Sequence, residues 1–179
     1  MILVDELSER RDFLSGTPFF GGLTGEALDL VVGMLTERRY PASAAVFREG
    51  EQGRAMYIVR QGDLIKYQSG ESGRLVKLMR FRAGDFFGET SLIDCQPNQF
   101  TVAAETSSVV YELTNRDLYQ LYQSDIAAYV MVLQNMNREL CRRLRKSDSR
   151  ITEYADEHGE TSTQIGIDIG KIRRLLPDE

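Results

Sequence analysis

Residues 84–101 have the sequence GDFFGETSLIDCQPNQFT, and this stretch decides the fold. Two phenylalanines precede Gly88 and are apolar, so we expect them to pack inward, while the glycine lets the backbone turn freely. The polar residues that follow supply an acceptor and several donors: Glu89, Thr90 and Ser91. Consecutive backbone N–H groups in such a turn form an anion-binding concavity, and the stretch therefore predicts a pocket for a sugar phosphate.

The stretch resembles the phosphate-binding cassette of cyclic-nucleotide-binding domains, whose pattern is roughly F-G-E-[LMT]-[AS]-L, then a short loop, then P-R-x-[AS]-[TS]. The matching residues are Phe87, Gly88, Glu89, Ser91, Leu92, Pro97 and Thr101. Two positions depart from the family pattern. Asn98 stands where the family has the arginine that pairs with the cyclic phosphate, and Phe100 stands where a small residue is usual.

The resemblance extends over about residues 18–150, through further blocks in the family's order and spacing: Pro18 to Thr24, Val46 to Gly53, Met56 to Asp63 and Arg142 to Leu144. It is strongest to the sensory domain of catabolite-activator-like bacterial regulators. About thirty residues remain after the expected long helix, beyond residue 150, which we expect to be too few for the DNA-binding helix-turn-helix of those regulators.

The hydrophobic pattern of the central part predicts short strands about ten residues apart, separated by glycine turns. The expected strands are Ala45 to Arg48, Met56 to Val59, Leu64 to Gln68, Leu75 to Met79, Phe100 to Ala104 and Ser108 to Leu113. Such spacing predicts a mainly β fold with flanking helices, a jelly-roll-like β-barrel of eight strands followed by a long C-terminal helix. We expect an N-terminal helical extension over 1–17, the cyclic-nucleotide-binding-like domain over 18–150, and a polar linker with a short C-terminal segment over 151–179.

Helices are predicted before and after the strand region in the sequence. Thr24 is the expected N-cap of a helix with apolar residues at helical spacing, and Asn115 the expected N-cap of a short helix through Tyr122. A longer helix is expected from about Asp125.

The resemblance assigns roles to the cassette residues. It implies that Glu89 accepts the ribose 2′-hydroxyl, and that the neighbouring amides and the Thr101 hydroxyl hold the cyclic phosphate of cAMP or cGMP. Asn98 donates a hydrogen bond but has no charge, and the loss of a charge-assisted pair costs about 2–5 kcal/mol. The predicted ligand-binding residues are Gly88, Glu89, Thr90, Ser91, Asn98, Gln99, Thr101 and Ser147.

Two alternatives stay open at this site. The Phe100 ring either points outward from the sheet or fills the phosphate space. Glu89 either recognises a ribose or satisfies loop amides alone. Ser147 is included because the resemblance implies a base contact one turn past the Arg-Arg-Leu block.

The expected long helix carries apolar residues three and four apart, which is the seam of a two-stranded coiled coil. These residues are Ile126, Tyr129, Leu133, Met136 and Leu140. The stripe either forms a homodimer, as the resemblance implies, or packs on its own barrel.

Composition excludes several classes of protein. The net charge of −5 disfavours a general nucleic-acid surface, although a basic run on the expected helix allows either a solvated face or DNA contact: Arg138, Arg142, Arg143, Arg145, Lys146 and Arg150. We expect no direct DNA binding, no membrane insertion and a cytoplasmic location, because there is neither a signal-peptide pattern nor an apolar run of about 18 residues.

The reactive residues are few. Cys95 and Cys141 are the only cysteines and are expected to be free thiols, and His158 is the only histidine, so no metal site is expected. No nucleophile with a base, no paired carboxylates and no Walker-type loop occur, so we expect no enzyme.

These observations leave two main functions. The first is a regulatory ligand-sensing domain with weakened or altered nucleotide binding. The second is a protein-interaction or assembly subunit, in a homodimer or a larger complex, that kept the fold without its ligand. Asn98 favours the second, and Gly88, Glu89 and Thr101 favour the first.

Overall fold

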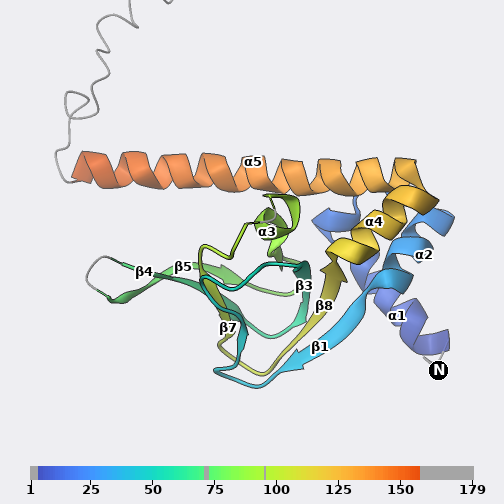
Figure 1. The fold of residues 1–179 in the computed structure, drawn as a ribbon, viewed down its shortest axis with the longest axis horizontal. Helices are drawn as coiled ribbons and strands as arrows, with labels where there is room; N and C mark the ends of the chain where they lie inside the picture. Colours follow the sequence, from blue (N-terminus) through green and yellow to red (C-terminus); the bar gives the residue numbers. More distant parts are fainter. Residues whose placement is uncertain (1–3, 71–72, 95, 158–179) are drawn as a thin grey trace, which may run out of the picture. The chain divides into compact units, whose positions relative to one another are not determined.

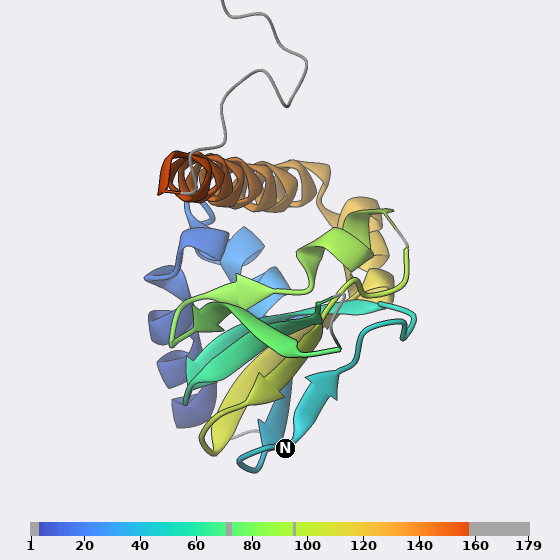
Figure 2. The same ribbon diagram turned by 90° about the vertical axis from the view of Figure 1, so that its left-hand side faces the viewer.

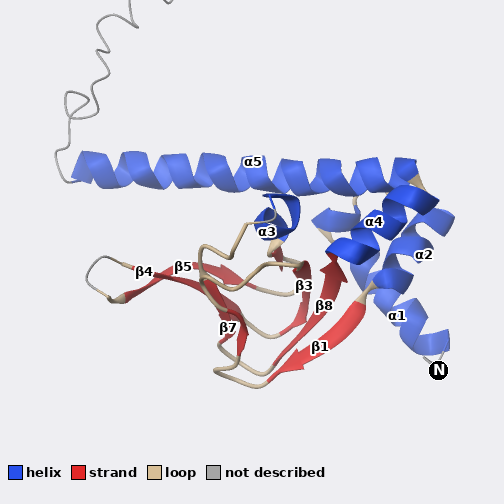
Figure 3. Ribbon diagram, in the orientation of Figure 1, coloured by secondary structure: helices blue, strands red, loops and turns tan. Residues whose placement is uncertain are grey.

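The computed structural model describes residues 4–70, 73–94 and 96–157. Contacts divide the chain into two units, residues 1–137 and residues 138–179. The first unit holds all of the described strands and most of the described helices. Figure 3 shows the helices in blue and the strands in red.

Eight strands form two four-stranded antiparallel sheets. In the first sheet the order is β1 (Thr36–Tyr40), β8 (Ser108–Thr114), β3 (Ala55–Gln61) and β6 (Phe86–Phe87). In the second sheet it is β2 (Ala45–Phe47), β7 (Thr101–Ala104), β4 (Leu64–Ser69) and β5 (Leu75–Phe81). The six strands expected from the sequence are all present, and β1 and β6 complete the eight.

Helices precede, interrupt and follow these strands in the sequence. They are α1 (Val4–Ser15), the 3-10 helix η1 (Pro18–Phe20), α2 (Gly25–Met34), α3 (Glu89–Asp94), α4 (Asn115–Ser124) and α5 (Ile126–Glu157). The N-terminal helices lie on one side of the strands in both views (Figure 1, Figure 2). The predicted fold class, strands with flanking helices and a long C-terminal helix, is confirmed.

The first sheet has two different apolar faces, because side chains alternate along its strands. Along β3, Met56 and Ile58 belong to a cluster with the helices α1, α2, η1, α4 and the start of α5. Tyr57 and Val59 belong to a second cluster with residues of β2, β4, β5 and β7. We call these the helix side and the barrel side of the first sheet.

The start of α5 is fixed within the first unit by a buried asparagine. Asn135 is 4% exposed, and its Nδ2 donates to the carbonyl oxygens of Phe19 and Gly21 at 2.9 and 2.8 Å. Ala128, Val132 and Met136 join the helix-side cluster from the same helix. This part of the helix therefore belongs to the domain core rather than to solvent.

One helix start differs from the sequence prediction, and one agrees with it. Thr114, not Asn115, caps α4, because its hydroxyl accepts from the Asp117 amide while the Asp117 carboxylate accepts from the Thr114 amide. Thr24 is the N-cap of α2 but makes no side-chain capping bond. The predicted domain limits at residues 17 and 150 stay predictions, and the C-terminal segment after residue 157 lies outside the described residues.

No helix in the described part of the chain combines the length and apolar character that a membrane crossing requires.

Candidate functional site

The turn between β6 and α3 requires glycine at residue 88. Its φ is +86°, and a Cβ atom there would lie 2.8 Å from the Ala55 carbonyl oxygen and 3.3 Å from the Met56 Cα. The turn follows directly on the pairing of Phe86 and Phe87 with β3. Because side chains other than hydrogen are strained in this conformation, only glycine lets the cassette lie against β3.

Glu89 begins α3 and is 3% exposed, so its carboxylate lies inside the first unit. Thr90 beside it is half-buried. The side chain of Ser91 lies outside the described residues, and its predicted role stays a prediction. An enclosed carboxylate next to a glycine turn is the arrangement that ribose recognition needs, and it equally serves loop amides.

The far end of the cassette is bonded to the connection between β2 and β3. The Asn98 amide donates to the Glu51 carbonyl at 2.8 Å, and the Asn98 carbonyl accepts from the Gly50 amide at 2.8 Å. Asn98 is 4% exposed, whereas Gln99 is exposed. Backbone hydrogen bonds therefore hold residue 98 in place, and they would remain if its side chain were replaced.

The Thr101 hydroxyl is also engaged. Its oxygen accepts a hydrogen bond from the Glu49 amide at 3.1 Å. In this structure Thr101, which was predicted to bind the phosphate, therefore links β7 to the segment that follows β2.

Phe100 packs inward rather than outward. Its ring is half-buried against the barrel-side cluster, with its centroid 6.0 Å from that of Phe47. The outward orientation is therefore not the one in this structure, and whether the ring fills the phosphate space stays a prediction.

Lys66 is the residue that the sequence analysis missed. Its Nζ lies 3.6 Å from the centroid of the Phe100 ring, which is a cation–π contact. On β4, Lys66 lies directly opposite Val102, which is fully buried in the barrel-side cluster. A lysine in the otherwise apolar run Leu64-Ile65-Lys66 is a signal that the sequence offered, but the family motif does not include it.

A cavity of about 720 Å³ lies between the β2–β3 connection and the start of α4. Two of its lining residues are bonded to each other, because the Tyr57 hydroxyl donates to Glu112 Oε1 at 3.4 Å. Arg38, which does not line the cavity, donates from Nε to Glu112 Oε2 at 2.8 Å. Burial, and next the Glu112 charge, strongly raise the pKa of Tyr57. This phenol therefore stays a neutral donor at physiological pH.

The predicted dimer residues on α5 have different surroundings. Ile126 is 62% exposed, Tyr129, Leu133 and Leu140 are half-buried, and Met136 is fully buried in the core of its own unit. The burial of Met136 removes it from the predicted dimer seam.

Other predicted features fall in different parts of the chain. Ser147 is exposed on α5, in the second unit, and its predicted role stays a prediction. Cys141 is a free, exposed thiol, while Cys95 and His158 lie outside the described residues. Across the described ranges, no group of three or more His, Cys, Asp or Glu side chains could hold a metal ion.

Residues 37–125 match the family model of the cyclic nucleotide-binding domain. Together with the glycine turn, the buried Glu89 and the two-sheet fold, this match defines the class: the chain belongs to the cyclic nucleotide-binding domain family.

Individual relatives agree with that class. The chain is 30% identical over 139 residues to the cyclic AMP receptor protein of Thermus thermophilus, covering 75% of this chain and 61% of that protein. It is 34% identical over 116 residues to a cAMP-dependent protein kinase regulatory subunit of Yarrowia lipolytica, covering 63% of this chain and 30% of that protein. The chain thus spans only part of the length of these relatives.

Solved structures show the same fold. The Thermus thermophilus catabolite activator protein superposes with a TM-score of 0.69 at 27% identity, over 78% of this chain and 63% of that one. A cyclic nucleotide-binding domain from Methylobacillus flagellatus superposes with a TM-score of 0.75 over 84% of each chain, at 21% identity.

Proposed function

We propose that this chain is a regulatory sensing domain whose cassette binds a cyclic nucleotide with altered recognition, the Lys66 ammonium supplying the charge that residue 98 lacks. The observation that carries the proposal is the Lys66–Phe100 contact at 3.6 Å, next to the cassette residue Thr101. The register places Lys66 opposite Val102, one residue along β7 from Thr101, while the Thr101 side chain lies on the other face of the sheet with Tyr67.

The substitution of one cation for another has a physical consequence. Arginine binds a phosphate through two parallel hydrogen bonds, whereas a lysine ammonium is a flexible point charge. Lys66 would also exchange its ring contact for the phosphate. We therefore expect binding that is weaker than an arginine-containing cassette would give.

The role that we assign is regulation rather than catalysis. The relatives are named as a receptor protein and a kinase regulatory subunit, which are sensors and not the catalytic chain. Ligand binding would act by shifting a conformational equilibrium of the chain or of its complex. We place this activity in the cytoplasm, without direct DNA contact.

A thermal titration tests the proposal. A ligand at a hundred times its dissociation constant adds about 2.7 kcal/mol to the free energy of unfolding, which raises the melting temperature by several degrees. We expect this rise with cAMP or cGMP and not with linear 5′-AMP. At the same nucleotide concentration, Lys66→Met should lower this stabilisation by about half or more, because a tenfold weaker affinity leaves only about 1.4 kcal/mol.

Lys77→Met is the matched control for that variant. Lys77 also lies over an aromatic ring, that of Tyr67 at 5.9 Å, but it is on β5 and pairs with Glu105. The proposal requires that this variant keep the response to nucleotide. Loss of the response in both variants would assign the effect to sheet stability instead.

A second function is favoured by the inward packing of Phe100 against Phe47. If this ring fills the ligand space, the domain acts as an interaction or assembly module. The absence of any thermal response at millimolar cyclic nucleotide would support this function over the sensor.

We also propose a homodimer through α5, along a seam shifted from the one that the sequence first indicated. Alternating steps of four and three residues connect Ile126, Val130, Leu133, Asn137, Leu140, Leu144, Ser147, Ile151 and Tyr154. Four of the apolar members are 45% to 63% exposed: Ile126, Val130, Leu144 and Ile151. Asn137 takes a core position, where a polar residue fixes register in parallel coiled coils.

Charged substitutions on this seam test the dimer. The double variant Leu144→Glu/Ile151→Glu should be a monomer in light scattering, because two charges would face each other across the seam. Lys146→Glu is the control, because Lys146 lies on the same helix but is not a member of this seam. It should leave the molecular mass in solution unchanged. A wild-type chain that is already monomeric would contradict the dimer.

A further inference from the structure

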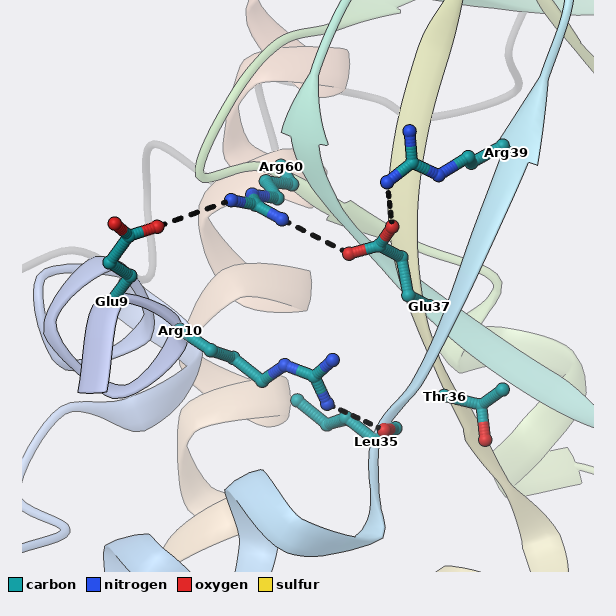
Figure 4. Close-up of a pocket in the computed structure, with 7 residues that line it drawn as sticks. All are labelled: Glu9, Arg10, Leu35, Thr36, Glu37, Arg39 and Arg60. Atoms are coloured by element: carbon teal, nitrogen blue, oxygen red, sulfur yellow. Dashed lines mark hydrogen bonds and ion pairs between the residues drawn. The ribbon is translucent and has the colours of Figure 1, made fainter. Parts of the chain in front are cut away.

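A second charged cavity, of about 550 Å³, lies on the helix side of the first sheet. We call it the arginine pocket. It is lined by Glu9 and Arg10 of α1, Leu35, Thr36, Glu37 and Arg39 at the start of β1, and Arg60 of β3 (Figure 4). None of these residues belongs to the cassette.

The charges in the arginine pocket do not balance. Glu37 lies between Arg39 and Arg60, with ion pairs of 2.7 and 3.0 Å, and Arg60 also approaches Glu9 at 4.0 Å. These two carboxylates compensate two of the three arginines. Arg10 is the remaining cation.

Arg10 is held in a position suited to a ligand. Its Nη1 donates to the Leu35 carbonyl at 3.1 Å, and within the described residues it forms no ion pair. Its guanidinium carbon lies 4.8 Å from the centroid of the Tyr111 ring, which fixes the plane of the group. Figure 4 shows this guanidinium facing the space below Arg60 and Glu37.

Tyr111 does not line the pocket itself, but its ring contacts two of the lining arginines, Arg10 and Arg60. The residue is fully buried, and its hydroxyl has no partner with hydrogen-bond geometry in the described part of the chain. Burial raises the pKa of this hydroxyl, and the adjacent Arg10 guanidinium opposes that rise both by its charge and as a side-chain donor. Arg60 also lies over its ring, at 6.0 Å. A buried hydroxyl without a partner costs about 1–3 kcal/mol, a cost that a bound acceptor would remove.

We propose that the arginine pocket binds a small organic monocarboxylate, with the carboxylate paired to Arg10 and within reach of the Tyr111 hydroxyl. One surplus positive charge matches a monoanion, and a planar carboxylate matches the remaining N–H groups of the guanidinium. The buried Leu35 beside it suits an apolar part of the ligand. Such a ligand would bridge α1 to β1 and β3, which makes the pocket a second effector site.

Titration at constant ionic strength tests this site, with pyruvate and benzoate as probes and inorganic phosphate as the comparison anion. We expect a carboxylate to raise the melting temperature and calorimetry to detect its binding. Arg10→Gln should lower the affinity at least tenfold. Arg11→Gln is the matched control, because Arg11 is the next residue of α1 but pairs with Asp29, and it should bind as wild type does.

Tyr111→Phe gives a second, independent measurement. Removing a hydroxyl that has no partner should leave the stability of the unliganded protein equal or higher, and should weaken carboxylate binding about threefold to tenfold. The proposal is overturned if neither carboxylate binds, if phosphate binds as well as both carboxylates do, or if Arg10→Gln retains wild-type affinity.

Discussion

The two faces of the first sheet place the same residue type in opposite surroundings. On the barrel side Tyr57 donates to the Glu112 carboxylate, and on the helix side the Tyr111 ring contacts the guanidinium groups of Arg10 and Arg60. The two tyrosines are neighbours across the pairing of β3 and β8, since Tyr57 lies opposite Glu112 and Ile58 opposite Tyr111. One sheet thus separates a region next to the cassette from a region that we assign to a second ligand.

The difference shows how strand alternation separates two environments within one domain. Burial is the leading cause that raises the pKa of both phenols. For Tyr57 the next cause, the Glu112 charge, raises the pKa further, whereas for Tyr111 the charges of Arg60 and Arg10 lower it.

The largest effect on stability is expected at the cassette, where Gly88→Ala would disturb the packing of the turn against β3. The strained left-handed conformation and the contact with the Ala55 carbonyl should together cost about 2–4 kcal/mol, or about 5–12 °C in melting temperature. Gly33→Ala on α2, with open space around the new Cβ, should leave stability unchanged or raise it by up to about 1 kcal/mol. Equal effects in the two variants would remove the special role of residue 88.

Alkaline unfolding would sharpen the comparison of the two tyrosines. A phenol whose folded pKa exceeds its unfolded value of about 10 stays neutral in the folded protein while the unfolded chain ionises, so stability is lost as pH rises above about 10. The loss is about 1.4 kcal/mol per pH unit until the folded pKa is reached. Tyr57→Phe should therefore flatten this decline more than Tyr111→Phe.

The measurement is denaturant unfolding at a series of pH values, with the slope against pH compared between variants. Tyr119→Phe is the control, because this side chain is 60% exposed and should leave the slope unchanged. A steeper dependence on Tyr111 than on Tyr57 would reverse our assignment of the two environments.

The smallest effect is expected from Glu37→Gln on the helix side. Removing one carboxylate leaves Arg39 and Arg60 less compensated, and carboxylate affinity should rise about threefold to tenfold. Stability should change by no more than about 1 kcal/mol, since both ion pairs are partly exposed. Glu105→Gln, which affects ion pairs of Lys77 and Arg80 on the second sheet, should not alter the affinity.

The fold was predictable because its signals are local. Strand spacing and glycine turns lie within short stretches of sequence, and the cassette occupies one continuous segment. The cap of α4 was assigned one residue late, because Thr114 and Asn115 are both good caps and only the reciprocal bonds with Asp117 distinguish them.

The rest of the candidate sites depends on contacts between distant residues. Lys66 and Phe100 meet only because β4 pairs with β7, and Arg10, Glu37 and Arg60 come from three separate elements. The dimer seam was shifted for a similar reason, since Met136 suits a coiled coil by spacing but is buried by its own domain. Periodicity does not reveal which of two apolar stripes faces the core.

The central claim is that Lys66 replaces the missing cassette arginine, and calorimetry of cAMP binding tests it most directly. We predict that the wild type binds cAMP measurably and that Lys66→Met binds it at least tenfold more weakly. Asn98→Arg should raise the affinity about tenfold or more. The double variant Lys66→Met/Asn98→Arg should recover the affinity that Lys66→Met loses. If the Phe100 ring fills the phosphate space, the gain will require Asn98→Arg/Phe100→Ala. The claim is contradicted if Lys66→Met binds as tightly as the wild type, or if no variant, Asn98→Arg/Phe100→Ala included, binds the nucleotide.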